Sequence, residues 1–168
     1  SEMCIRDSSL PYQIVTAGRD QVIDRVLKAC FELSILEIQA LTQSEAVAFV
    51  LASIVTCNDA DKLQAKTIVV TDKNTFDDLV SHYENLIIIT TLRDNMSYAL
   101  SHNHTVICAV TPEDQVPTAV KLPRVEREGF VKAIEDCGFD SIQARKIATD
   151  TARDVNVLRR RMKIDKLK

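Results

Sequence analysis

Glycine, proline and tryptophan are scarce or missing in this chain of 168 residues, which has three glycines, four prolines and no tryptophan. So little glycine and proline excludes collagen-like, linker-like and low-complexity proteins. Aromatic residues make up 5% of the chain, which is too few for a surface that stacks bases or sugars. No run of 18 apolar residues is present, so the sequence predicts no membrane-spanning helix. The length and the 46% hydrophobic content are typical of one globular domain, with or without a small appendage.

An excess of basic charge is also missing, because 21 lysines and arginines face 24 acidic residues and the formal net charge is −3. This balance argues against a general nucleic-acid-binding protein. The cysteines lack the C-x-x-C spacing of zinc sites and redox motifs. Four of them follow residue 8 and have apolar neighbours: Cys30, Cys57, Cys108 and Cys137. We expect free, slowly reacting core thiols in a reducing compartment, which predicts a cytoplasmic protein.

Residues 1–8 read Ser-Glu-Met-Cys-Ile-Arg-Asp-Ser and resemble the translation of a transposon adapter used in sequencing libraries. We therefore expect them to be an artefact outside the fold, with a natural N-terminal extension as the open alternative. An adapter at this position implies that the chain is a fragment of a longer protein. The lack of a signal peptide would then carry no information about location.

Strand-like apolar runs alternate with helical patterns between residues 35 and 122. The expected strands cover residues 35–40, 67–70, 86–90, 105–110 and 118–122. These runs are continuously apolar, which is typical of parallel strands covered on both faces. The sequence therefore predicts an α/β fold, with a parallel sheet of about five strands and helices on both faces. Upstream, we expect a short extended segment at residues 12–16 and a helix whose apolar face runs from Val22 to Phe31.

After Pro123 only helical patterns remain. One helix ends at Gly138, a second is capped by Asp140 and directs Ile142 inward, and a third covers about residues 154–163. The sequence thus predicts an α/β domain at residues 9–122 and a small, lid-like helical subdomain at residues 123–168. Residues 151–168 hold seven basic and two acidic side chains, so positive charge is concentrated there.

The turn after the first expected strand reads Leu-Thr-Gln-Ser-Glu-Ala over residues 41–46. An α/β nucleotide-binding fold holds phosphate groups at such a turn, using glycines whose N–H groups converge and a lysine. This turn has neither, and Glu45 places a negative charge in the first helical turn. We therefore predict a structural helix that begins with a Thr42-x-x-Glu45 capping box.

Two further patterns are weak candidates for a metal site. Asp72 follows a strand and could hold magnesium, although an aspartate there is also an ordinary turn residue. His102 and His104 have the H-x-H spacing of a chelate but no cysteine or carboxylate close by in the sequence. We predict a turn at Asp72, a solvent-exposed turn at the histidines, and no metal site.

The last helix carries the basic residues that are candidates for nucleic-acid contact: Arg159, Arg160, Arg161 and Lys163. Three consecutive arginines in a helix spread over most of its circumference, whereas Leu158 and Met162 share one apolar side. We expect the arginines to form a solvated face, and nucleic-acid binding stays an alternative.

The order of these patterns resembles the STAND class of P-loop NTPases, which is akin to AAA+ and NB-ARC modules. Residues 15–20, Val-Thr-Ala-Gly-Arg-Asp, are similar to the small-Gly-Arg-acid motif that precedes the phosphate loop in that class. The strand–helix series comes next. Residues 120–125, 130–134, 144–148 and 155–159 are similar to the tail of the STAND helical subdomain. The resemblance covers about residues 10–162.

The chain departs from that class where its chemistry should lie. Residues 41–46 replace the Walker A turn, and the strand at residues 86–90 lacks the Walker B acid. A closer resemblance is to large bacterial multidomain proteins whose STAND-like module is degenerate in the same way and which are suspected of anti-phage roles. The resemblance implies a non-catalytic regulatory or scaffold module with no cofactor. Its expected partners are other domains of the same parent chain, and self-association into a homo-oligomer is left open.

Two alternatives stay open at this point. The first is an atypical nucleotide switch, and its candidate binding residues are Gly18, Arg19, Gln43, Ser44 and Glu45. The second is a nucleic-acid-binding module that acts through the basic C-terminal segment.

Overall fold

The computed structural model describes residues 12–166, with side-chain surroundings for residues 14–161. The expected adapter artefact at residues 1–8 lies outside the described residues. The chain divides into two compact units. The sheet unit comprises residues 21–122, and the described part of the helical unit comprises residues 12–20 and 123–166. The sequence-based division placed residues 9–20 with the sheet, whereas the structure groups residues 12–20 with the helices.

The sheet unit contains five parallel strands in the order β2-β3-β4-β1-β5. Their bounds are β1 (Ile35–Gln39), β2 (Thr67–Val70), β3 (Ile87–Thr90), β4 (Thr105–Val110) and β5 (Val120–Lys121). The predicted α/β fold with an all-parallel sheet of five strands is confirmed. In the register of the central pair, Glu37 of β1 lies opposite Cys108 of β4.

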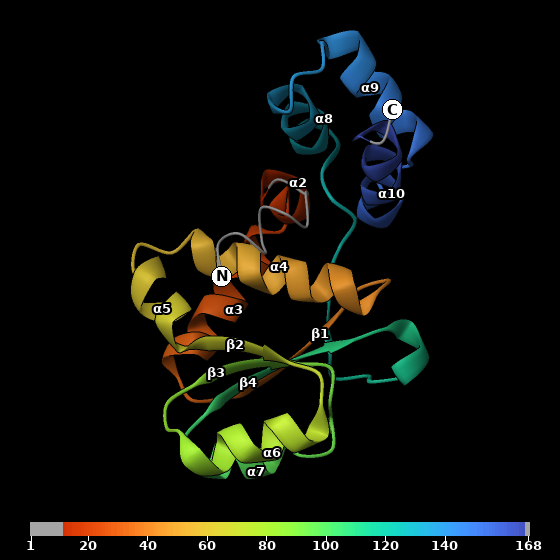
Figure 1. Ribbon diagram of the computed structural model, residues 1–168. Coiled ribbons are helices and arrows are strands. Elements are labelled where there is room, and N and C mark those ends of the chain that lie inside the picture. The colour runs from red at the N-terminus through yellow and green to blue at the C-terminus, as the bar shows by residue number, and fades with distance from the viewer. Residues whose placement is uncertain (1–11, 167–168) are drawn as a thin grey trace. The chain divides into compact units, whose positions relative to one another are not determined.

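Helices cover both faces of this sheet, as parallel strands with crossover connections require. In the sheet unit they are α3 (Asp20–Phe31), α4 (Gln43–Val55), α5 (Ala60–Lys66), α6 (Lys73–His82), α7 (Met96–Ser101) and the 3₁₀ turn η1 (Pro112–Asp114). Figure 1 shows α3 and α4 on one face, and α6 and α7 on the other. The short helix α5 and the turn η1 are absent from the sequence-based prediction.

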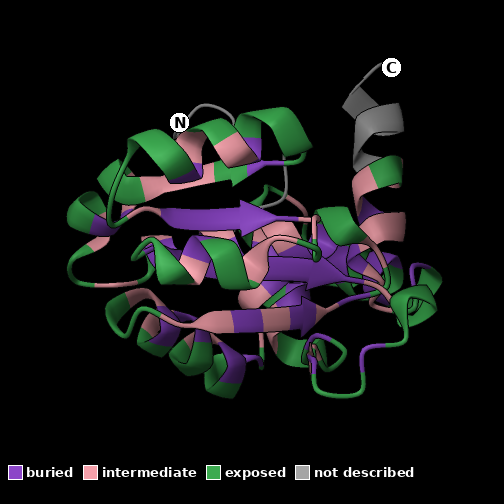
Figure 2. Cartoon of the chain, turned by 90° about the horizontal axis from the view of Figure 1, so that it is seen from below, coloured by how far each residue is buried: buried purple, intermediate pink, exposed green. Residues whose placement is uncertain are grey.

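The core of the sheet unit lies on β3 and β4, in which every residue is buried. Figure 2 shows the central strands in purple between helices that are green on their outer sides. On the face of α6 and α7, Phe76 and Val80 pack with Ile88 of β3 and Val106 of β4. Each such side chain contributes about 1.5–3 kcal/mol when it is fully buried. Burial of these strands therefore contributes much of the apolar stabilisation of the sheet unit.

The helical unit consists of α2 (Tyr12–Thr16), α8 (Arg127–Asp136), α9 (Ser141–Asp150) and α10 (Val155–Lys166). Helix α8 packs against α2 and α9 and buries Phe130 and Ile134. The predicted caps are present. Asp140 accepts a hydrogen bond from the N–H of Gln143 at 2.8 Å. Gly138 follows Cys137, the C-cap of α8, and has φ of +105°, where a glycine closes a helix without strain.

The extended conformation predicted for residues 12–16 is wrong, because this segment is the helix α2. The prediction rested on the β-branched residues Ile14, Val15 and Thr16, which favour strands by propensity. Tertiary packing overrides that preference: α2 lies against α8, and Ile14 and Val15 are buried.

Two predictions about helix faces and caps are also wrong. Ile142 is 83% exposed instead of facing inward. The buried face of α9 is formed by Ala144, Ile147 and Ala148, and Ile142 lies about 200° from Ala144 around the helix. The pattern Thr75-x-x-Asp78 in the sequence also predicted a cap for the helix after the second strand, but Asp72 is the N-cap of α6 instead.

Candidate functional site

The carboxyl edge of the sheet is the first place to look for a site in an open parallel fold. Ligands bind there at the point where the strand order reverses. Here the chain leaves β1 toward the β2 edge and later leaves β4 toward β5 on the other side. The reversal therefore lies between the adjacent strands β1 and β4, and the nearby loops follow β1, β3 and β4.

In the turn after β1, a side chain of the turn itself caps an N–H group in the first turn of α4. Thr42 is the N-cap of α4, and its Oγ1 accepts a hydrogen bond from the N–H of Glu45 at 3.1 Å. Its carbonyl oxygen also accepts from Ala46 at 3.3 Å. Glu45 is 5% exposed, whereas Gln43 and Ser44 lie at the surface. The predicted capping by Thr42 is thus present, and one of the three N–H groups proposed to hold a nucleotide already has a partner.

The ends of β2 and β3 present no free carboxylate. Thr90 ends β3, is fully buried, and accepts a hydrogen bond from the N–H of Leu92 at 3.0 Å. Asp72 follows β2 and accepts hydrogen bonds from the N–H and the hydroxyl of Thr75, both at 2.8 Å. These bonds lower the pKa of Asp72, with the backbone bond as the largest cause. Asp72 therefore acts as the N-cap of α6, in line with its predicted turn role.

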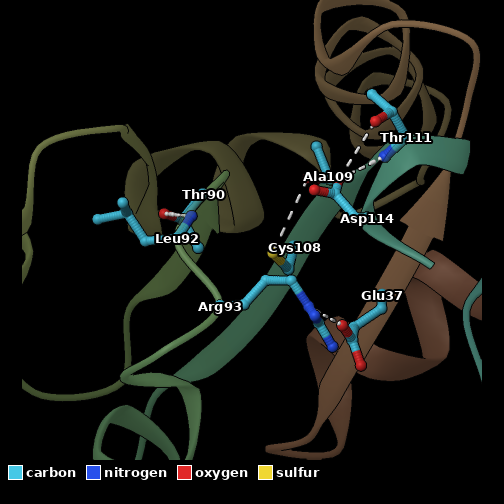
Figure 3. Close-up of polar contacts among 8 residues, drawn as sticks. All are labelled: Glu37, Thr90, Leu92, Arg93, Cys108, Ala109, Thr111 and Asp114. Atoms are coloured by element: carbon cyan, nitrogen blue, oxygen red, sulfur yellow. Dashed lines mark hydrogen bonds and ion pairs between the residues drawn. The ribbon is translucent and has the colours of Figure 1, made fainter. Parts of the chain in front are cut away.

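An ion pair spans the carboxyl side of the sheet. Arg93, in the loop after β3, donates from Nε to Oε2 of Glu37 on β1 at 2.9 Å. Figure 3 shows the side chain of Arg93 extending next to Cys108 of β4 toward Glu37. The Glu37 side chain is 15% exposed and that of Arg93 is 41% exposed. This hydrogen bond is the largest cause that raises the pKa of Arg93.

Sequence reasoning missed the pair between Glu37 and Arg93. A signal was present, because Glu37 is the one acidic residue within the five strands of the described sheet. A carboxylate in the middle of a buried strand requires a partner, but 56 positions separate it from Arg93. Only the neighbouring positions of β1, β4 and β3 bring the two residues together.

The loop after β4 satisfies its own polar groups as well. Asp114 accepts hydrogen bonds from the N–H of Thr111 at 2.8 Å and from its hydroxyl at 3.3 Å, which forms a capping box on η1. Figure 3 shows this pair beside Ala109 and Cys108. The carboxyl edge is therefore a set of capped turns and one ion pair. Such an arrangement stabilises loops and leaves little free hydrogen-bonding capacity for a phosphate chain.

The other two residues of the nucleotide hypothesis, Gly18 and Arg19, belong to the helical unit. Gly18 has φ of +71°, and a Cβ at this position would lie 2.6 Å from the Cβ of Glu126. Arg19 is 3% exposed. It donates from Nε to the carbonyl oxygen of Pro123 at 2.8 Å and from Nη1 to that of Val15 at 3.0 Å. The Gly-Arg motif thus has a structural role in joining α2 to the segment before α8.

The two histidines of the H-x-H pattern lie in different environments. His102 is exposed, and its ring packs against Tyr98 with centroids 4.4 Å apart. His104 is fully buried, which corrects the prediction that the whole turn is exposed. Its Nδ1 accepts from the N–H of Leu86, and its Nε2 lies 3.1 Å from the carbonyl oxygen of Val80. No cluster of three metal-binding side chains occurs among residues 14–161.

The four cysteines form no disulfide with one another, as predicted, but they are not all in the core. Cys108 is buried, Cys30 and Cys57 are half-buried, and Cys137 is exposed. Burial raises the pKa of Cys108 to about 12 and that of Cys30 to about 11. Cys137 is the C-cap of α8, where the helix ends and its side chain meets solvent. Its apolar neighbours in the sequence therefore gave the wrong expectation.

The arginines of α10 form only in part the solvated face that was predicted. Arg160 is exposed, and Arg161 lies 3.5 Å from a carboxylate oxygen of Asp150. Arg159 is half-buried, and its Nε has no hydrogen-bond partner in the described part of the chain. Leu158 is buried as expected. The side chains of Met162 and Lys163 lie outside the described residues.

The chain matches no family model, no curated protein and no solved structure. Within the described part of the chain, no helix combines the length and the apolar character needed to cross a membrane.

Proposed function

We propose that the chain is a non-catalytic, NTPase-like module that regulates or scaffolds a larger bacterial protein, with anti-phage defence as the setting that the STAND resemblance suggests. The observation that carries this proposal is the β1–α4 turn. Thr42 caps α4 with its own side chain, and none of residues 41–46 is a glycine or a lysine. Every residue of the turn carries a Cβ, which keeps backbone N–H groups from converging closely on a phosphate.

Two further features support the absence of hydrolysis. Catalysis of phosphoryl transfer needs a magnesium ion held by a hydroxyl and a strand-end acid, together with a lysine on the phosphates. Thr90 stands at the end of β3, and its hydroxyl caps the following loop. Glu45 adds a carboxylate to the first turn of α4, where it opposes an anion.

The atypical nucleotide switch is the second candidate. Gln43 and Ser44 are exposed at the start of α4, and their N–H groups have no partner among the described residues. The first N–H groups of a helix are oriented toward an anion. In this candidate Ser44 supplies the hydroxyl, and Glu45 opposes the bound charge.

Isothermal titration with Mg·ATP, Mg·GTP and the two diphosphates separates these candidates. We expect no saturable heat with any of them. Ser44→Glu is the informative variant because Ser44 is exposed at the turn, and Ser97→Glu on exposed α7 is its matched control. Gly18 and Arg19 are unsuitable probes because both are packed inside the helical unit. Nucleotide binding with a micromolar Kd that is lost in Ser44→Glu and kept in Ser97→Glu would refute the scaffold proposal and support the nucleotide switch.

A further inference from the structure

A cavity opens at the amino edge of the sheet, on the opposite side from the loops discussed above. Its volume is about 340 Å³, at the lower end of the range of small-molecule sites. Its walls come from the end of α3, from α5 and from the starts of β3 and β4, all of which belong to the sheet unit. One side of the cavity is formed by the first residues of the buried strands β3 and β4, Ile87 and Thr105.

One part of the cavity wall is apolar and open to water. Phe31 is 59% exposed and Leu33 is 50% exposed, and both line the cavity. Leu63 of α5 is 4% exposed and forms a buried part of the same wall. Covering apolar surface gains roughly 25 cal/mol per Å². An apolar group placed between these side chains would therefore be stabilised.

The polar part of the wall carries a surplus of positive charge. Lys62 and Lys66 lie one helical turn apart on α5 and both line the cavity. Like charges at this spacing repel each other, and neither ammonium group has an ion-pair partner among the described residues. Asp59 is the one acidic residue of the wall. The lining therefore has a net charge of one positive unit, next to an apolar surface.

We propose that this cavity binds a small organic anion that has an apolar body and a single acidic group such as a carboxylate. The apolar body packs against Phe31, Leu33 and Leu63, and the acidic group pairs with Lys62 and Lys66. A neutral molecule of the same shape would leave the two lysines repelling each other, so the site discriminates by charge. This site is independent of the module's proposed role, because it uses none of the residues of the β1–α4 turn.

The test uses sodium octanoate as the probe and octanol as its uncharged counterpart. Both are titrated into the whole chain while binding is followed by calorimetry. The variant Lys62→Met/Lys66→Met removes both charges and keeps apolar stems of similar length. Both lysines are exposed, so this change leaves the fold intact, which urea unfolding verifies. Lys73→Met, on an exposed position of α6, is the matched control.

We expect octanoate to bind more tightly than octanol. Its Kd should rise about tenfold in the double variant, as the loss of one to two partly exposed ion pairs predicts, and stay unchanged in Lys73→Met. Equal affinity for octanol, an equal effect of Lys73→Met, or no saturable binding of octanoate would each overturn the proposal.

Cys30 provides a second readout because it lines the same cavity. Saturating octanoate should slow alkylation of Cys30 at least severalfold, while the exposed Cys137 keeps its rate. Alkylation of Cys30 at an unchanged rate in saturating octanoate would place the bound molecule elsewhere and refute the assignment.

Discussion

Replacing His104 with phenylalanine should destabilise the sheet unit strongly, although the two rings have similar shapes. His104 is fully buried, and its ring links the start of β3 to the end of α6. Because the N–H of Leu86 donates to Nδ1, the ring proton lies on Nε2, which donates to the carbonyl oxygen of Val80. Phenylalanine removes both bonds and leaves a donor and an acceptor of the backbone unpaired.

The expected cost follows from these two groups. An unsatisfied buried polar group costs about 1–3 kcal/mol, so the loss of both partners in His104→Phe should lower the free energy of unfolding by about 2–6 kcal/mol. That is a large part of the roughly 5–15 kcal/mol by which small proteins are stable. His104→Asn keeps an acceptor close to the position of Nδ1, so we expect its loss to be smaller.

Urea unfolding followed by circular dichroism measures this effect. With a mid-range m value of about 2 kcal/mol per molar urea, the midpoint of His104→Phe should fall by roughly 1–3 M. His102→Phe is the control, since His102 is exposed and its substitution should change stability by at most about 0.5 kcal/mol. If the two variants had equal midpoints, the bonds of His104 would contribute nothing and the reasoning would be refuted.

Four other outcomes are expected. Gly18→Ala should lower the free energy of unfolding by about 1–3 kcal/mol, because a side chain strains the backbone at φ of +71° and meets Glu126. Gly138→Ala adds backbone strain alone and should lower it by less. Equal losses of stability in urea melts would contradict this. At pH 8, alkylation followed by mass spectrometry should label Cys137 first and Cys108 last, and fast labelling of Cys108 would be the contrary result. Because the pKa of Asp72 is lowered in the folded state, its carboxylate stabilises the fold at pH values above its ordinary pKa of 3.8. This contribution is lost as the pH falls through the lower pKa of the folded state. The stability advantage over Asp72→Asn should therefore be smaller at pH 2 than at pH 7, and an advantage independent of pH would count against it. Double-stranded DNA should bind no better than non-specifically, with a Kd of about 10⁻⁴–10⁻⁶ M at physiological salt, and a tight, sequence-dependent mobility shift would promote the nucleic-acid alternative.

The fold class and most element positions could be predicted from local patterns along the chain. Continuously apolar runs such as residues 86–90 and 105–110 indicate buried parallel strands, because both faces of these strands must be covered. Thr42 and Asp140 mark helix starts through a local mechanism, in which a side chain accepts a hydrogen bond from an N–H three residues later. Such signals depend on neighbours along the chain, so they can be interpreted without knowing the fold.

Contacts between residues far apart in the sequence could not be predicted in this way, because they depend on the assembled fold. Residues 12–16 have strand propensity, but they form a helix that packs against α8 and in which Ile14 and Val15 are buried. The pairing of Glu37 with Arg93 and the burial of His104 depend on which strands are neighbours, and the strand order is not encoded in local periodicity. The cavity beside Lys62 and Lys66 is likewise made by segments far apart in sequence. A site of that kind exists only once the sheet has assembled, because its walls are contributed by elements that the sheet brings together.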